Sequence, residues 1–461
     1  MRLKSGTIEI PLDNIYLHDE LSRQKSVNNL ATLLQNVSSP LVFSVNGSWG
    51  GGKTTFMKML YSTLVNCDAK SVYFSAWETD FAEDPLIAFI GEMNEALCKY
   101  IIGDEEKSRA WGIAKTAGSH ILKRSIPVGV KIATVGLLDL DKVYEDEASK
   151  LTEALTKEAI DGYSKNKASI ALFKESVAKV LATDGGAPGK MFIFVDELDR
   201  CRPTYAIELL ERVKHLLDVE GLVFILAMDK TQLAHSVKAV YGAEFNAIGY
   251  LKRFIDIEFT LPQADTMPFV KGLLSKLELD SYFANRILSQ NRNDRNTLLE
   301  TLNVVTQKMS LRDIEQLISK IKLVSLTIDP RQTFNIVFVL FLLVVKDQYF
   351  DVYQEFSKSV STGAELTILI NLIFPGEEHV WVRQYLEGII IASKLQTSQA
   401  WVASKIEGFN NVYHSNSASA AEKENAGRIL EVIQDNTRMG RGFDVAAILD
   451  RIDMLSQFGF D

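Results

Sequence analysis

The segment Gly47-Ser-Trp-Gly-Gly-Gly-Lys-Thr54 constrains the fold of this 461-residue chain more than any other feature. It fits the pattern G-x-x-x-x-G-K-[ST] at every fixed position, it follows the apolar run Leu41–Val45, and a helical pattern opens at Thr55. A glycine-rich turn between a buried strand and a helix presents backbone N–H groups and the positive end of the helix to an anion. The segment therefore predicts a phosphate-binding loop in preference to a chance glycine-rich turn.

Each position of this loop has an expected task. Lys53 is expected to reach the β- and γ-phosphates of a nucleoside triphosphate, and the Thr54 hydroxyl is expected to hold Mg²⁺. We take the ligand to be ATP. The residues of the loop expected to bind it are Gly47, Trp49, Gly50, Gly51, Gly52, Lys53, Thr54 and Thr55.

Four further apolar runs along the chain have the composition of buried strands. They are Ser71–Ala76, Met191–Val195, Leu222–Met228 and Asp256–Leu261. Helical patterns separate the runs, which is typical of an α/β fold built on a parallel sheet. We therefore expect a P-loop NTPase core with a parallel sheet, a helical insertion and a mainly α-helical C-terminal region.

The spacing of these runs predicts the domain organisation. Residues 1–98 and 189–262 are expected to form the two parts of the core. Residues 99–188 are longer than one crossover requires and predict a helical insertion, which ends in the Gly- and Pro-rich, flexible segment Asp184–Gly189. Residues 263–461 are expected to be helical, with a lid-like part to about residue 325 and then helices that bind an effector or partner.

Acidic residues follow two of the predicted strands. Asp196 and Glu197 come directly after Met191–Val195; we expect Asp196 to orient the Mg²⁺ shell and Glu197 to polarise the attacking water as general base. The simpler interpretation, acidic residues that merely end a strand, is disfavoured by the phosphate-binding loop. Asp229 follows Leu222–Met228, and two compatible roles stay open: it senses the γ-phosphate through a water, or it caps the next helix.

Charge on a transferring phosphoryl group also calls for a cation from outside the loop. Arg200, Arg253 and Arg312 are the candidates, in the same subunit or in a neighbouring one. Arg312 is favoured by its setting at a helix start, Ser310-Leu-Arg-Asp313. We take Arg253 and Arg312 as catalytic candidates beside Lys53 and Glu197, with surface ion pairs as the alternative for each arginine.

Composition bounds the environment of the protein. With 50 Lys and Arg against 59 Asp and Glu, the formal net charge of −9 gives no global attraction to nucleic acid or anionic lipid. Three widely spaced cysteines and the lack of an export signal predict a cytoplasmic protein. The apolar stretches Ile126–Leu140 and Ile336–Val345 fall short of the roughly 20 residues that a spanning helix needs, so we expect core helices and no transmembrane segment.

Taken together, the motifs resemble the KAP family of P-loop NTPases, a branch of the additional-strand, catalytic-glutamate class. The family-like segments are Ser22-Arg23, Asn46–Thr54, Phe74-Ser-Ala-Trp77, Asp196-Glu-Leu-Asp-Arg-Cys201, Ala227-Met-Asp229 and Gly249-Tyr-Leu-Lys-Arg-Phe254. The resemblance implies an ATPase with metal and water roles at Thr54, Asp196 and Glu197 and a polar sensor at Asp229. Two departures stand out: Asp196-Glu replaces the frequent Asp-Asp, and the insertion lacks the transmembrane helices of many members.

Three functional hypotheses follow. The first is a regulatory or assembly ATPase that forms a homo-oligomer and acts through a separate effector protein; family analogy extends it to bacterial antiphage defence. The second is a non-catalytic, nucleotide-gated oligomeric scaffold. The third is a nucleic-acid-stimulated motor, for which the sequence carries no recognisable nucleic-acid reader.

Overall fold

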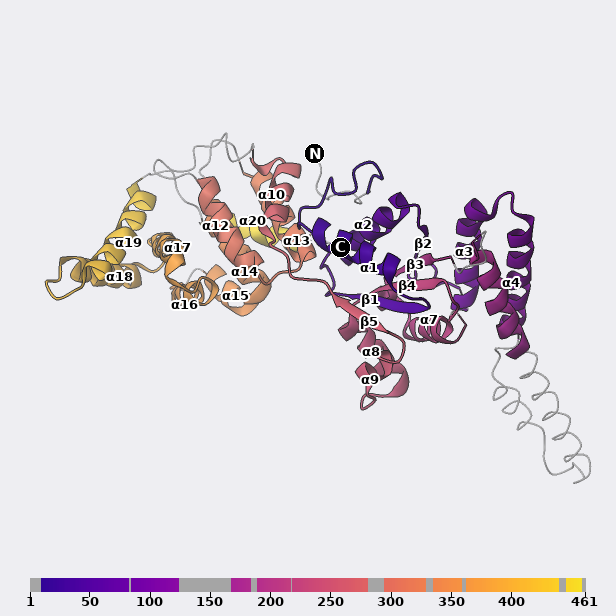
Figure 1. Cartoon of the computed structure of the whole chain (residues 1–461). Coiled ribbons are helices and arrows are strands. Elements are labelled where there is room, and N and C mark those ends of the chain that lie inside the picture. Colours follow the sequence, from indigo (N-terminus) through magenta and orange to yellow (C-terminus); the bar gives the residue numbers. More distant parts are fainter. Residues whose placement is uncertain are drawn as a thin grey trace, which may run out of the picture. The chain divides into compact units, whose positions relative to one another are not determined.

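The computed structural model describes residues 10–82, 84–123, 167–183, 189–216, 218–280, 294–328, 335–358, 362–438 and 445–457. The chain divides after Gln263 into two compact units. All the strands of the described residues lie in the N-terminal unit, and the described part of the C-terminal unit is built from helices (Figure 1).

A parallel sheet of five strands forms the centre of the N-terminal unit. The strands are β1 (Leu41–Asn46), β2 (Lys70–Ser75), β3 (Met191–Asp196), β4 (Leu222–Met228) and β5 (Ile257–Thr260). Their order across the sheet is β2-β3-β4-β1-β5, and every neighbouring pair is parallel. The predicted strands and their parallel arrangement are confirmed, each with bounds within one residue of the prediction.

Helices precede and connect the strands of this sheet. Those of the N-terminal unit are α1 (Gln24–Asn36), α2 (Lys53–Asn66), α3 (Pro85–Ile101), α4 (Glu105–Lys123), α7 (Pro203–Leu216), α8 (Lys230–Tyr241) and α9 (Ala247–Leu251), with a further helix over residues 167–181. The segment expected to be a helical insertion is thus helical where it is described. The stretch Ile126–Leu140 and residues 184–188 lie outside the described residues.

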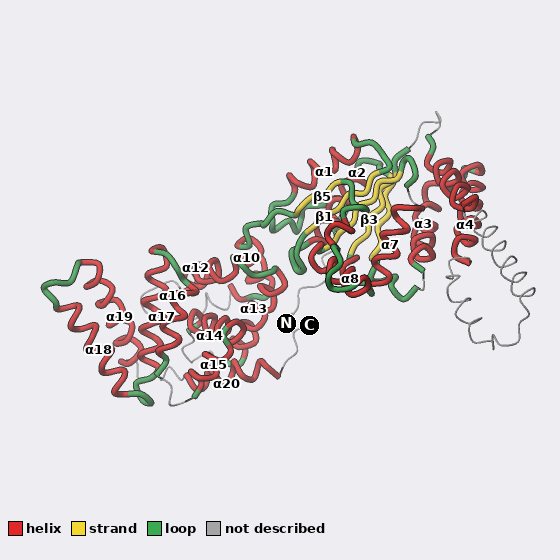
Figure 2. Tube along the Cα trace, turned by 90° about the horizontal axis from the view of Figure 1, so that it is seen from below, coloured by secondary structure: helices red, strands yellow, loops and turns green. Residues whose placement is uncertain are grey.

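The sheet is covered by helices on both faces, as Figure 2 shows. Alternate residues of β4 point to opposite sides: Val223 and Ile225 pack with α1 and α2, whereas Leu222, Phe224 and Leu226 pack with α3, α7 and α8. All seven residues of β4 are buried. Because no face of the strand meets water, its sequence is apolar at every position, which is the pattern expected of a parallel sheet.

The C-terminal unit is organised around one apolar helix. The helices described in this unit are α10 (Met267–Lys276), α12 (Asp294–Thr306), α13 (Leu311–Leu326), α14 (Ile336–Gln348), α15 (Phe350–Ser357), α16 (Ala364–Ile373), α17 (Val380–Ser393), α18 (Gln399–His414), α19 (Ala420–Arg438) and α20 (Val445–Met454). Helix α14 packs against α12, α13, α15, α17 and α20, and every residue from Ile336 to Val345 is buried.

The stretch Ile336–Val345 is therefore a core helix, as its length and its closing charges Lys346 and Asp347 predict. A helix that is apolar all round must be surrounded by other apolar surfaces. Lys346, at its end, reaches Asp453 of α20 with 2.7 Å between Nζ and Oδ1. Among the described residues, no helix is long and apolar enough to cross a membrane.

Substitution of Phe341, a fully buried residue of α14, tests this core. Phe341→Ala removes a ring and leaves a cavity, so the free energy of unfolding of the C-terminal unit should fall by about 3–5 kcal/mol. Hydrogen exchange of the α14 amides in the full chain, measured against urea, reports this change. The control Ile368→Ala on α16, at a side chain that is 69% exposed, should change this free energy of unfolding by less than about 0.5 kcal/mol. Equal effects of the two substitutions would contradict the assignment of α14 as the core.

Candidate functional site

The phosphate-binding loop connects the end of β1 to the start of α2. The amide of Gly47 donates to the carbonyl oxygen of Met228 at the end of β4, with an N···O distance of 3.1 Å. Gly50 and Gly52 have φ angles of 69° and 78°, in the left-handed region that favours glycine. A Cβ on Gly51 would lie 3.0 Å from the carbonyl oxygen of Ser48. The run of three glycines is thus required by the curl of the loop.

Lys53, the first residue of α2, is 9% exposed and folds over this loop. Its Nζ donates to the carbonyl oxygens of Gly47 at 2.7 Å and Ser48 at 3.2 Å. The same Nζ lies 3.7 Å from Oδ2 of Asp199. The ammonium is therefore held at the centre of the loop, where a cation would meet phosphate oxygens.

Asp196 is 2% exposed at the end of β3, and both of its carboxylate oxygens accept hydrogen bonds. Oδ2 accepts from the hydroxyl of Tyr73 on β2 at 2.6 Å, and Oδ1 accepts from the amide of Glu197 at 2.8 Å. Burial, reinforced by the charge of Asp196, raises the pKa of Tyr73 far above its ordinary value. Tyr73 is thus a permanent donor that orients the carboxylate, a role that the sequence alone does not indicate.

Glu197 follows with a left-handed φ of 62° and turns its side chain toward β2. Its Oε2 accepts from the hydroxyl of Ser75 at 2.7 Å. Its Oε1 lies 2.7 Å from Nη1 of Arg200, whose guanidinium also lies 6.0 Å from the centre of the Trp77 ring. Of the three arginines considered from the sequence, Arg200 is the one that the structure brings to a catalytic candidate, through Glu197.

Asp229 joins the loop to the next helix. Its Oδ1 accepts from the amides of Thr231 and Gln232 at 3.0 and 3.2 Å, so it is the N-cap of α8. Its Oδ2 accepts from the amide of Trp49 at 3.1 Å. The capping role is confirmed, while the role of a phosphate sensor stays a prediction.

Asp199 carries a fourth carboxylate, which the sequence analysis quoted within a motif without assigning it a task. Besides its ion pair with Lys53, its Oδ2 accepts a hydrogen bond from the indole N–H of Trp49. The side chain of Asp199 is 2% exposed. Its position three residues after Asp196 was visible in the sequence, but the turn that aims it at the loop was not.

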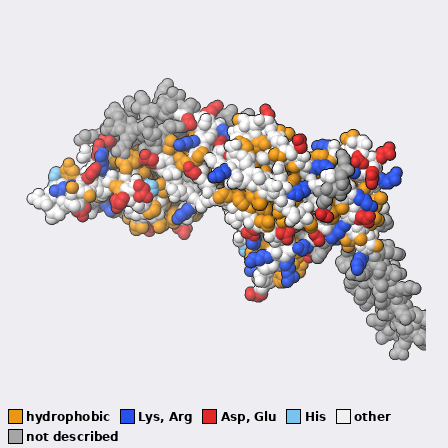
Figure 3. Space-filling model, viewed as in Figure 1, with side chains coloured by type: hydrophobic (Ala, Val, Ile, Leu, Met, Phe, Trp, Pro, Cys, Tyr) orange, Lys and Arg blue, Asp and Glu red, His pale blue; other side chains and the backbone are white. Residues whose placement is uncertain are grey.

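The two remaining arginines, Arg253 and Arg312, belong to different units of the chain. The amide of Asp256, three residues after Arg253, donates to Val42 near the start of β1; from there the strand runs about 13 Å to Asn46 before the loop begins. Arg253 therefore precedes β5 near the amino ends of the strands, away from the loop. Figure 3 shows Lys and Arg side chains gathered over α8 and α9. Arg312 is the second residue of α13 in the C-terminal unit and lies within the Ser310–Asp313 capping box.

The order of the strands adds the deciding observation, because β4 lies between the loop-bearing β1 and the carboxylate-bearing β3. A model of the KAP family P-loop domain matches residues 23–328. The chain belongs to the KAP family of P-loop NTPases. In this KAP protein β4 is the additional strand that the class name describes, and the loop is the nucleotide-binding element of the family.

Other comparisons add little to this assignment. No curated protein matches the chain. Among solved structures, a DNA replication initiation factor is similar at 11% identity and a TM-score of 0.32, covering 96% of this chain and 98% of the other. The Aeropyrum pernix ORC2 protein, solved as ADPNP-ADP complexes, is similar at 11% identity and a TM-score of 0.32, with 95% of each chain covered.

Arg23, the first residue of the family match, supports the P-loop of this KAP NTPase by hydrogen bonds to its backbone. It is 6% exposed, and its Nη1 and Nη2 donate to the carbonyl oxygens of Gly52 at 3.0 Å and Gly51 at 2.8 Å. Burial lowers the pKa of Arg23 to about 10, with Asp19 opposing the shift, so the guanidinium stays charged at neutral pH. The fork holds both carbonyls away from the phosphate side of the loop.

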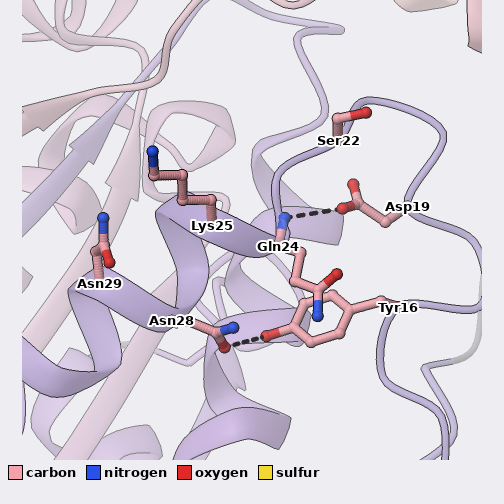
Figure 4. A pocket seen from close by; sticks show the side chains of 7 residues that line it. All are labelled: Tyr16, Asp19, Ser22, Gln24, Lys25, Asn28 and Asn29. Carbon is pink, nitrogen blue, oxygen red and sulfur yellow. Dashed lines mark hydrogen bonds between the residues drawn. The ribbon is translucent and has the colours of Figure 1, made fainter.

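Residues on both sides of Arg23 line a polar hollow of about 600 Å³ (Figure 4). Asp19 accepts from the amide of Gln24, and the hydroxyl of Tyr16 donates to Oδ1 of Asn28. The other lining residues are Ser22, Lys25 and Asn29. The segment that supports the P-loop is thus itself fixed by hydrogen bonds.

Substitution of Arg23 should loosen the loop without touching the ligand. Arg23→Ala leaves the Gly51 and Gly52 carbonyls without their charged donor, so nucleotide affinity should fall by about ten- to a hundredfold. Arg23→Lys should rescue only part of the loss, because an ammonium does not reproduce the planar fork. Calorimetric binding of a non-hydrolysable ATP analogue measures both. Lys25→Ala, a nearby exposed cation, is the control; wild-type affinity in Arg23→Ala would refute the supporting role.

Proposed function

We propose that this KAP NTPase binds ATP with Mg²⁺ at the P-loop, hydrolyses it with Glu197 as general base, and acts as a regulatory or assembly ATPase. The observation that carries the proposal is the convergence of a phosphate loop, a buried carboxylate and a second carboxylate at one edge of the sheet. Hydrogen bonds from Tyr73 and Ser75 of β2 hold Asp196 and Glu197 there, and an ion pair with Asp199 holds Lys53. Such an arrangement fits phosphoryl transfer, which depends on positioning and charge.

The donors at this edge fit magnesium. Mg²⁺ prefers hard oxygen ligands and is usually held by one or two carboxylates together with phosphates, without a protein cage. Asp196 and the Thr54 hydroxyl are such ligands, and the described residues contain no group of three His, Cys, Asp or Glu side chains suited to a metal. Bound there, the ion would neutralise charge on the phosphates.

Glu197 is the residue proposed to accept the proton of the attacking water. For this task one of its oxygens must leave Ser75 or Arg200, both of which hold it in the structure. Rotation away from Ser75 would keep the ion pair with Arg200 while the second carboxylate oxygen turned to the water. The contacts with Ser75 and Arg200 would therefore determine when Glu197 is free to accept a proton from the water.

Separate substitutions of Lys53 and Glu197 distinguish binding from chemistry. Lys53→Ala removes the cation at the loop centre, so ATP affinity and turnover should fall together. Glu197→Gln keeps the shape but removes the base, so ATP should still bind while hydrolysis falls by about 10²–10⁴-fold. Equilibrium ATP binding and phosphate release are measured on each variant.

The matched control is Glu244→Gln, the same change at an exposed glutamate of the same unit. It should leave both binding and turnover unchanged. Wild-type hydrolysis by Glu197→Gln would show that another group is the base.

One observation favours the second hypothesis, a nucleotide-gated scaffold that does not turn over. Both carboxylate oxygens of Glu197 are engaged by protein partners, and a base that never leaves them would allow binding without hydrolysis. ATP binding with no phosphate release by the wild-type chain would select this alternative. The separate effector and the role in antiphage defence stay predictions from the family resemblance.

We further propose that the NTPase is a homo-oligomer in which Arg253 or Arg312 approaches a neighbour's phosphate. Arg253 lies near the amino ends of the strands, away from its own P-loop, and is exposed like its neighbour Lys252, so it would act on another subunit. With a non-hydrolysable analogue, the mass from light scattering should rise, and Arg253→Ala or Arg312→Ala should lower turnover by at least about tenfold. Lys252→Ala is the control. An unchanged mass with both arginine variants fully active would exclude this arrangement.

A further inference from the structure

We propose that Asp199 is a positioning residue of the nucleotide site. It holds the P-loop through the indole of Trp49, and it pairs with the ammonium of Lys53 until a bound phosphate replaces it as the partner of that ammonium. The inference rests on the proposed function, because it takes the P-loop to be the site of ATP binding. It assigns a task to a carboxylate that neither coordinates the metal nor activates the water in the mechanism above.

The geometry around Asp199 is specific. The residue lies in the short turn η2 (Leu198–Arg200) that follows Glu197. One oxygen, Oδ2, accepts the indole N–H of Trp49 and also lies 3.7 Å from Nζ of Lys53. Trp49 is held a second time, through its amide, by Asp229. The third residue of the P-loop is thus fastened to the ends of both β3 and β4.

The charge of Asp199 and its hydrogen bond act on nucleotide affinity in opposite directions. A carboxylate that is only 2% exposed needs donors and an opposite charge to offset its desolvation. Its charge attracts Lys53 and repels the phosphates that compete for the same ammonium, so it weakens binding. Its hydrogen bond to Trp49 keeps the loop in shape, so it strengthens binding. Substitutions can separate these two effects.

Asp199→Asn removes the charge but keeps an oxygen that can accept the indole N–H. ATP-analogue affinity should therefore rise by about tenfold, the size expected when one charge near the phosphates is removed at an effective dielectric constant of about 20–40. Asp199→Ala removes the acceptor as well, so it should bind about three- to tenfold more weakly than Asp199→Asn. Calorimetry with a non-hydrolysable ATP analogue and Mg²⁺ gives both dissociation constants.

Trp49→Phe completes a double-mutant cycle, because phenylalanine keeps a ring but has no N–H to donate. It should weaken binding in the wild-type background and have no further effect in Asp199→Ala. The control Asp218→Asn makes the same chemical change at a side chain that is 61% exposed, and it should leave affinity within about twofold of wild type.

The contact can also be tested without nucleotide. The indole N–H resonance that disappears in Trp49→Phe should shift in Asp199→Asn and Asp199→Ala and stay in place in Asp218→Asn. This spectrum tests the contact even if the chain binds no ATP, so failure of the proposed function would not be mistaken for failure of this inference. Weaker analogue binding by Asp199→Asn than by wild type, or an indole resonance unmoved in Asp199→Ala, would overturn the proposal.

Discussion

The parallel register of β1, β2, β3 and β4 is the constraint on which the whole site depends. Ser75 pairs with Asp196 across β2 and β3, and Asn46 pairs with Met228 across β1 and β4. Since the strands run in one direction, the residue after each strand appears at the same edge of the sheet. A slip of one residue in either pairing would turn the affected side chains to the other face, and the bonds of Tyr73 to Asp196 and of Ser75 to Glu197 would be lost.

Every carboxylate at this edge of the sheet has hydrogen-bond or ion-pair partners within the protein before any ligand is considered. Four carboxylates meet there, and each has a donor from a different segment: Tyr73 for Asp196, Ser75 and Arg200 for Glu197, Trp49 and Lys53 for Asp199, and the Trp49 amide for Asp229. Buried carboxylates without such partners would be protonated or would destabilise the fold. The same partners fix the orientation of each side chain, which is the preorganisation that charge-stabilising catalysis requires.

Much of this site could be predicted from local sequence, and the remainder could not for one physical reason. The strands, the P-loop, Asp196 and Glu197 follow from patterns within a few neighbouring residues. Arg23, Tyr73, Ser75 and Asp199 act through contacts with segments 28 to 150 residues away, and no local pattern encodes such distances. Ser75 came nearest to prediction, because it is the second-last residue of the predicted strand Ser71–Ala76 and lies at the edge where the other candidates gather. For Arg253 the sequence showed that the residue precedes the last predicted strand, but only the sheet showed that it lies at the edge away from the P-loop.

The turn after β3 connects two tasks that the mechanism keeps separate. Glu197 begins it with a left-handed φ of 62°, a conformation that costs a non-glycine residue about 1–2 kcal/mol and that the partners at both ends hold in place. Asp199, two residues on, contacts the P-loop lysine, while Glu197 contacts Ser75 and Arg200. In the proposed mechanism a triphosphate draws Lys53 from Asp199, which changes the forces on this turn, and the same turn carries Glu197, the proposed base. Nucleotide binding would thereby alter the availability of Glu197 through three consecutive residues, without any movement of the sheet. The half-exposed Trp77, whose ring centre lies 6.0 Å from the Arg200 guanidinium, connects this turn to the protein surface.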